Sequence, residues 1–265
     1  MISECSRTAH NGSAERLARR VLDALRGAGH TTVTAAHLEH AATLPPEDQV
    51  AALGAVRLLG ADVLAPYVLT GSAPPAEETV AVAAALDALP PAQPPPAAPP
   101  GGPEPAWVRA WIDWSLVTVL ARIDPAVTAP TAPEPPPPPR CAAPTAPRHA
   151  PATAEGGVTH EGWVPWSVLM GQLSPLALPG LDGPVHQAAR SGATGLARGA
   201  TRAVLRRDFP TAARITRWLA WLHAEGVRLP LDPAPLTEHI TLLGGGGRVA
   251  LDTAIAGRLL GLESV

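Results

Sequence analysis

The spacing of apolar residues predicts helices along most of the chain. After Ser13, a residue type that favours the helix N-cap, leucine and valine recur every four positions as far as Leu25 and share one helix face. In the C-terminal part the same spacing predicts helices over 165–173, 184–207, 210–225, 233–243 and 248–261, with Gly192 and Gly195 weakening the second of these. Two short runs, 31–33 and 67–70, leave short extended pieces as an option, but nothing in them requires a sheet. We therefore predict an all-α protein.

Proline residues divide this helical pattern. Twenty of the 33 prolines lie between Pro90 and Pro151, and proline removes a backbone donor and disrupts helix interiors. Such stretches are typical of extended, polyproline-II-like linkers. The predicted organisation is a flexible N-terminus (1–12), an N-terminal helical region (13–89), a Pro-rich linker (90–105), a Trp-rich helix (106–124), a second Pro-rich linker (125–157) and a C-terminal helical bundle (158–265). The successive amphipathic helices favour two antiparallel, bundle-like regions with one isolated apolar helix between them.

The helix between the two linkers is apolar on nearly every side. Trp107, Trp111 and Trp114 form one stripe at i, i+4 and i+7, and most other positions from 107 to 123 are also apolar. Such a helix must be buried, since each tryptophan alone hides about 150–250 Å². We expect it to dock on its own chain, against the C-terminal region. The alternative is a tethered helix that fills a groove in a protein partner, with these three tryptophans as the partner-binding residues.

The basic residues of the chain are all arginine, 20 in number, and no lysine is present. This excludes a lysine Schiff base and a P-loop lysine. Between 186 and 223, seven arginines stand against a single acid, Asp208. They predict a surface for nucleic acid, a phosphorylated ligand or an acidic partner, unless they only solvate the outside of the bundle. The predicted anion-binding residues are Arg198, Arg202, Arg206, Arg214, Arg217 and Trp221.

Motifs for metal binding and catalysis are weak. His37 and His40, at i and i+3 of a predicted helix with His30 nearby, are a pair that zinc accepts, but the sequence has no H-E-x-x-H motif and no cysteine partner for them. We expect these histidines to face solvent, and we expect no metal and no cofactor. The glycine tract 244–247 is a generic anion site if it opens a helix, although a plain turn is favoured. Cys5 and Cys141 lie in predicted flexible segments, so we expect no structural disulfide between them.

Charge and the N-terminal sequence bear on location. The net charge is −3 and the estimated pI is about 6.3, which does not favour polyanion binding by the molecule as a whole. The first residues lack the basic and apolar blocks of a secretory signal, and no uncharged apolar stretch is long enough to span a bilayer. We therefore expect a cytoplasmic protein without membrane contact.

The lack of a catalytic motif and the two binding-type features predict a non-enzymatic helical interaction, scaffold or regulatory protein. We expect a protein partner, while the sequence leaves the oligomeric state open and resembles no family closely enough to name one. A nucleic-acid-associated regulator that uses the Arg-rich C-terminal surface is the alternative. A second alternative is an enzyme without a recognisable motif, which a deep pocket uniting carboxylates or histidine with several arginines would favour.

Overall fold

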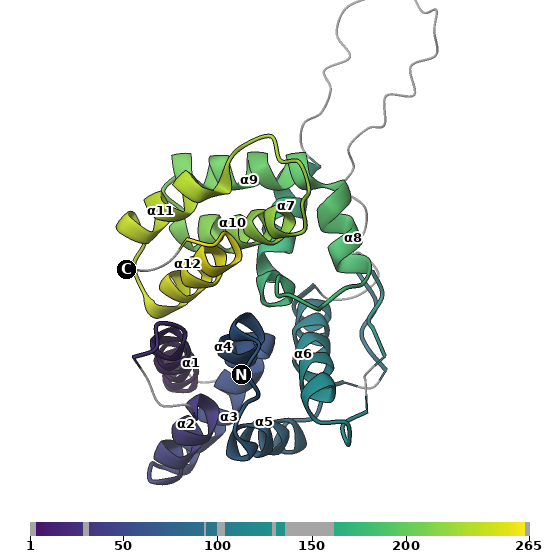
Figure 1. Ribbon diagram of the computed structural model, residues 1–265. Coiled ribbons are helices and arrows are strands. Elements are labelled where there is room, and N and C mark those ends of the chain that lie inside the picture. Colours follow the sequence, from purple (N-terminus) through teal and green to yellow (C-terminus); the bar gives the residue numbers. More distant parts are fainter. Residues whose placement is uncertain are drawn as a thin grey trace, which may run out of the picture.

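The computed structural model describes residues 4–28, 32–92, 94–99, 104–128, 131–135 and 162–262. Every regular element in these ranges is a helix, so the all-α prediction is confirmed. The helices of the N-terminal region and those of the C-terminal region form two groups that lie against each other (Figure 1). The Trp-rich helix α6 (Glu104–Ile123) lies beside the N-terminal group, and one of its ends reaches the C-terminal group (Figure 1).

The N-terminal group contains α1 (Glu4–Leu25), α2 (Val33–Ala42), α3 (Pro46–Leu59), the 3-10 helix η1 (Gly60–Leu64), α4 (Ala65–Thr70) and α5 (Ala76–Ala88). A proline in the first turn of α3 has a fixed φ suited to a helix start, and acidic residues follow it. In α5 the buried carboxylate of Glu78 accepts hydrogen bonds from the backbone N–H groups of Thr34, at 2.7 Å, and Ala35, at 3.1 Å. Glu78 thereby satisfies two free amides at the start of α2.

Three predictions for this group are wrong. Helix α1 begins at Glu4, so it includes most of the segment predicted to be flexible. Ser13 is not its N-cap, because the side chain is fully buried in mid-helix and its Oγ lies 3.1 Å from Nε2 of His37. The same contact turns His37 into the core and away from solvent. Segment 67–70, for which extended structure is the other option, belongs to α4, whose first residues are buried.

The C-terminal group contains α7 (Trp163–Gln172), the 3-10 helix η2 (Ser174–Leu176), α8 (Pro184–Ser191), α9 (Ala193–Leu205), α10 (Phe209–Ala224), α11 (Pro233–Leu243) and α12 (Gly247–Leu259). The predicted segments agree with α7 to α12 to within a few residues at each end, and the second is broken at Gly192. The ring of Trp166 packs against Gly192 so closely that no Cβ atom fits there. Gly195, by contrast, stays inside α9.

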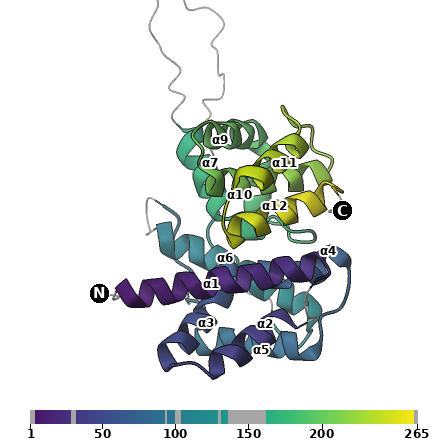
Figure 2. The same ribbon diagram turned by 90° about the vertical axis from the view of Figure 1, so that its left-hand side faces the viewer.

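Helix α6 joins the two groups because its halves belong to different hydrophobic cores. Leu116 and Leu120 in its C-terminal half pack in one core with residues of α1 to α5 and α12. Trp107 and Trp111 in its N-terminal half pack in a second core with residues of α7, α9 and α10. Across the boundary between the groups, α1 lies directly against α12, as the side view in Figure 2 shows. The two helical regions therefore form one continuous body.

One helical stretch, Pro46–Thr70, is long and apolar enough to cross a membrane when only length and composition are considered for the described residues. It comprises α3, η1 and α4, and 72% of its apolar window is buried inside the protein. A core helix meets the same criteria, so packing in the core accounts for the apolar character of this stretch.

The buried histidine of α2 makes stability depend on pH. Burial, followed by the charges of Arg20, Arg16 and His40, lowers the pKa of His37 from 6.5 to about 4. Between these values the unfolded chain binds a proton that the folded chain does not bind, so stability falls as the pH drops from 6.5 towards 4. The loss reaches at most about 3 kcal/mol. Urea unfolding at pH 7 and pH 4.5 is expected to show a steeper loss for the natural protein than for His37→Gln. Equal losses in both proteins would contradict this role for His37.

Candidate functional site

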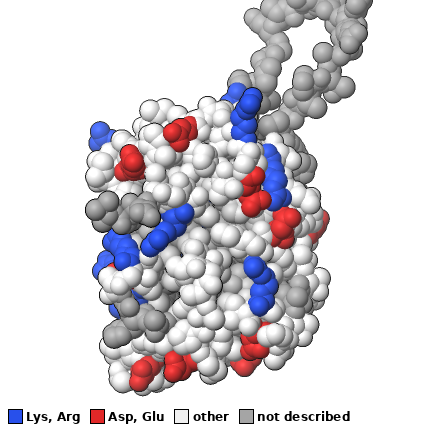
Figure 3. Space-filling view, in the orientation of Figure 1, with Lys and Arg blue, Asp and Glu red and all other residues white. Residues whose placement is uncertain are grey.

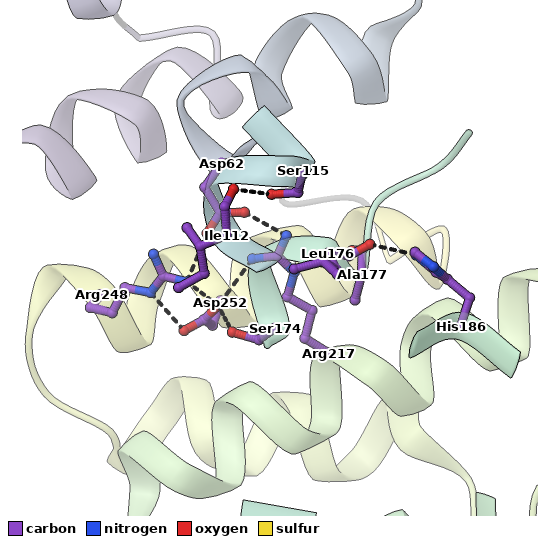
Figure 4. Close-up of polar contacts among 10 residues, drawn as sticks. All are labelled: Asp62, Ile112, Ser115, Ser174, Leu176, Ala177, His186, Arg217, Arg248 and Asp252. Atoms are coloured by element: carbon purple, nitrogen blue, oxygen red, sulfur yellow. Dashed lines mark hydrogen bonds and ion pairs between the residues drawn. The ribbon is translucent and has the colours of Figure 1, made fainter. Parts of the chain in front are cut away.

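Two arginines and two aspartates meet in the interior where the two groups of helices join (Figure 4). Arg217 of α10 donates to Asp62 of η1 at 2.5 Å and to Asp252 of α12 at 3.1 Å. Arg248, in the first turn of α12, lies 2.7 Å from Asp62 and 3.0 Å from Asp252. Each guanidinium thus bridges both carboxylates. These four residues, here called the buried ion network, are balanced in charge.

Neighbouring polar groups complete the buried ion network. Nε of Arg217 donates to the carbonyl oxygen of Ala177 at 3.3 Å, and the hydroxyl of Ser174 donates to Asp252 at 3.5 Å. Burial acts to raise the pKa of Asp252, but the charges of the nearby arginines outweigh it, so the pKa is lowered. Because Asp62 belongs to the N-terminal group and the other three members to the C-terminal group, the network holds the two groups together.

A cavity of about 650 Å³ opens beside the buried ion network, at the boundary between the two groups. Helices α1 and α3 contribute to its wall from the N-terminal group, α6 from between the groups, and α7, η2, α10 and α12 from the C-terminal group. Its charged and amide-bearing lining consists of Asn11, Glu15, Arg109, Gln172, Arg214 and Arg248. We call this cavity the arginine cleft.

Arg214 of α10 is a half-buried cation without a partner. It makes no hydrogen bond and no ion pair with any residue that the structure describes. Burial lowers the pKa of Arg214 and the charge of Arg248 lowers it further, whereas Asp252 and Asp208 act in the opposite direction. The carboxylate of Asp208 is itself engaged as the N-cap of α10, where it accepts from the N–H of Thr211 at 3.2 Å. With the network neutral, Arg214 adds one unbalanced positive charge.

Arg109 of α6 contributes a second unbalanced charge to the arginine cleft. The nearest carboxylate, that of Asp113, is taken by a two-pronged contact with Arg57, in which Nε lies 2.6 Å from Oδ1. Arg109 donates instead to the carbonyl oxygen of Arg57, at 2.7 Å. Burial lowers the pKa of Arg109, the charge of Asp113 compensates in part, and the charge of Arg57 lowers the pKa further. Within the described residues Arg109 forms no ion pair.

Glu15 forms no ion pair with Arg109 or Arg214, because its carboxylate contacts other groups. It accepts hydrogen bonds from the backbone N–H of Gly247 and, at 3.4 Å, of Arg248, and it lies 3.3 Å from the guanidinium of Arg19. The glycine tract therefore does open a helix, and a carboxylate from α1 occupies the N-terminus of α12. Among the described residues, the two half-buried guanidinium groups of the arginine cleft form no ion pair with an acid.

The predicted anion-binding residues do not share one surface. Arg198, Arg202 and Arg206 are exposed, on α9 and just after it, and Arg214 lines the arginine cleft. The prediction of a surface position is wrong for Arg217 and Trp221, which are fully buried. Arg217 is held inside by carboxylates, one of them 155 positions away in the chain. The guanidinium that stacks over the ring of Trp221, at 4.9 Å, is that of Arg190.

The tryptophans of α6 are covered by their own chain. Trp107 and Trp111 are fully buried, and both indole N–H groups donate to the carbonyl oxygen of Glu134, at 2.8 Å and 3.3 Å. Trp114 is partly buried and packs edge-on against Trp111, with ring centroids 5.3 Å apart. Trp107 and Trp111 therefore offer no free surface to a partner in this structure.

Sequence reasoning missed Arg109, Arg248 and Glu15 as residues of the site. A signal existed for the first two, because Arg109 is a charge within an otherwise apolar helix and Arg248 follows a glycine tract. Glu15 carried none, since an acid on a helix face normally meets solvent. Its partner lies 232 positions further along the chain.

Metal binding finds no support in the described part of the chain, where no group of three or more His, Cys, Asp or Glu side chains is placed to hold an ion. His37 is turned into the core, whereas His40 is exposed. Comparisons with protein-family models, with curated proteins and with solved structures find no match to this chain. Its function must therefore be inferred from the geometry of the arginine cleft.

Proposed function

We propose that this protein is a regulatory binding protein that takes up a small dianionic ligand in the arginine cleft. The observation that carries the proposal is the pair of half-buried guanidinium groups, Arg109 and Arg214, neither of which forms an ion pair with a carboxylate in the part of the chain that the structure describes. A cation partly withdrawn from water without an ion-pair partner is less well solvated, and a bound anion offsets that cost. Guanidinium groups also bind phosphate and carboxylate through two parallel hydrogen bonds, which gives the contact direction as well as strength.

The size and position of the cleft support the same proposal. Its volume of about 650 Å³ lies within the range of about 300–1,000 Å³ that is usual for small-molecule sites. Arg109 is bonded to the backbone of α3 in the N-terminal group, and Arg214 belongs to α10 in the C-terminal group, so one ligand would link side chains anchored in both groups. Ligand binding would therefore add to the contacts that hold the two groups together, as the buried ion network does.

Binding without catalysis is the better-supported alternative for this cleft. Its described lining contains no histidine or cysteine, and its one carboxylate, that of Glu15, is already engaged by the N-terminus of α12. A general acid or base needs a titratable group within reach of the substrate, and Glu15 is not free for that role. The cleft thus contains a carboxylate beside several arginines, the arrangement that would favour an enzyme. That carboxylate, however, is not free to act on a substrate.

A macromolecular partner remains a second candidate, and one observation favours it. Arg198, Arg202 and Arg206 are exposed, and the neighbouring Leu205 is 80% exposed. Together they form a small basic and apolar patch on α9 that suits an acidic protein partner better than nucleic acid. On the face seen in Figure 3, the basic side chains that are described occur singly or in small groups, separated by uncharged or acidic residues. This arrangement supports a local contact and not a long phosphate-binding track.

The proposal is tested by measuring the binding of inorganic phosphate and sulfate to the full chain at constant ionic strength, with chloride as the reference anion. Isothermal titration is expected to detect both dianions. Replacing Arg109 or Arg214 with methionine is expected to weaken binding at least about tenfold, because a charge-assisted hydrogen bond is lost. Arg198→Met, which removes an exposed arginine, is the matched control and is expected to bind as the natural protein does.

A second result of the same experiment separates binding from folding. Removing an unpaired half-buried charge is not expected to destabilise the ligand-free protein, so Arg214→Met should unfold at the same urea concentration or a higher one. If Arg214→Met keeps the affinity of the natural protein, or if Arg198→Met loses as much, the dianion is not bound in the arginine cleft.

A further inference from the structure

The arginine cleft also exposes apolar side chains, which is unusual for this protein. Large apolar residues are exposed at only a few of the described positions, and two of these, Leu58 and Val168, line the arginine cleft. Leu58 is 36% exposed on α3, and Val168 is 41% exposed on α7. They come from opposite groups of helices, so the cleft has uncovered apolar surface on both of its sides.

Each of these apolar side chains lies close to one of the unbalanced guanidinium groups. Leu58 follows Arg57, whose carbonyl oxygen accepts the hydrogen bond from Arg109. Val168 lies about one helical turn before Gly171, and a Cβ at Gly171 would be 3.6 Å from the Cβ of Arg214. The same cavity is therefore lined by both guanidinium groups and by exposed apolar side chains.

We infer that the ligand is an organic dianion, such as a phosphate monoester, whose hydrocarbon part covers Leu58 and Val168 while its anionic group lies between Arg109 and Arg214. This inference rests on the proposed function. An inorganic ion would fill only a small part of a cavity of about 650 Å³ and would leave both apolar side chains in contact with water. Val108 and Ile112 of α6 continue the apolar wall, so a short hydrocarbon chain has a surface to lie on.

The test is a series of phosphate monoesters of equal charge, namely methyl, ethyl, propyl and butyl phosphate, compared with inorganic phosphate by isothermal titration on the full chain. Burial of one methylene group favours binding by about 0.8 kcal/mol, so each added carbon is expected to tighten binding by about three- to fourfold while the chain remains inside the cleft. Leu58→Ser and Val168→Ser are expected to flatten this increase with chain length.

The control variant is Val80→Ser, which changes a valine that is 66% exposed on α5, outside the cleft. It should leave the increase with chain length intact. If butyl phosphate binds no more tightly than inorganic phosphate, or if Leu58→Ser and Val168→Ser leave the increase unchanged, the inference is overturned while the proposed function stands. If neither inorganic phosphate nor any ester binds, the proposed function fails and the inference fails with it.

Discussion

Replacement of Arg217 with methionine is expected to destabilise the protein by about 3–5 kcal/mol, because it leaves buried carboxylates with too few cations. Arg217 is fully buried and bridges Asp62 and Asp252, so only Arg248 would remain to balance two negative charges. Urea unfolding followed by tryptophan fluorescence measures the loss. Arg202→Met, at an exposed position, is the control and should change stability by no more than about 0.5 kcal/mol.

A double variant sharpens this prediction. Arg217→Met combined with Asp62→Leu leaves Arg248 and Asp252 as a balanced pair four positions apart on one helix. Because the unpaired charge is removed, the double variant is expected to lose less stability than Arg217→Met alone. A double variant at least as unstable as the single one would show that charge balance is not what the buried ion network provides.

Replacement of Trp111 with alanine is expected to cost about 3–5 kcal/mol, the usual range for truncating a buried aromatic side chain. Trp111 is fully buried and its ring centroid lies 6.4 Å from that of Trp107. Since α6 belongs to both hydrophobic cores, the loss should lower a single unfolding transition and not split it. Trp163→Ala, at a partly exposed position, should cost clearly less. A loss below about 1 kcal/mol for Trp111→Ala would mean that α6 does not hold the cores together.

The helices themselves could be predicted because residues close in sequence determine where each helix begins and ends. Apolar spacing of about four residues, proline in first turns and glycine at ends placed α7 to α12 to within a few residues, and the predicted segment 233–243 has the same bounds as α11. Helix α1 was an exception. Ser13 has the side chain of an N-cap, but a tertiary contact with His37 uses its hydroxyl in mid-helix.

The site could not be predicted in the same way, because a charged residue looks alike in sequence whether it meets water or a distant partner. Arg214 and Arg217 lie within one turn of the same helix. Arg217 is paired with carboxylates in the core, whereas Arg214 lines the cleft without an ion pair among the described residues. What separates them is the position of Asp62, in a 3-10 turn of the other helical group. Burial of that kind depends on how the groups pack, which apolar spacing does not encode.

The claim that Arg109 and Arg214 form an anion site is tested most directly by locating a bound dianion in crystals of the full chain. Crystals grown with selenate in place of other multivalent anions would reveal its position through the anomalous scattering of selenium. The account predicts a selenium peak in the arginine cleft, within hydrogen-bond distance of both guanidinium groups. A cleft without a peak, in crystals where selenate is seen on exposed arginines such as Arg198 or Arg202, would contradict it.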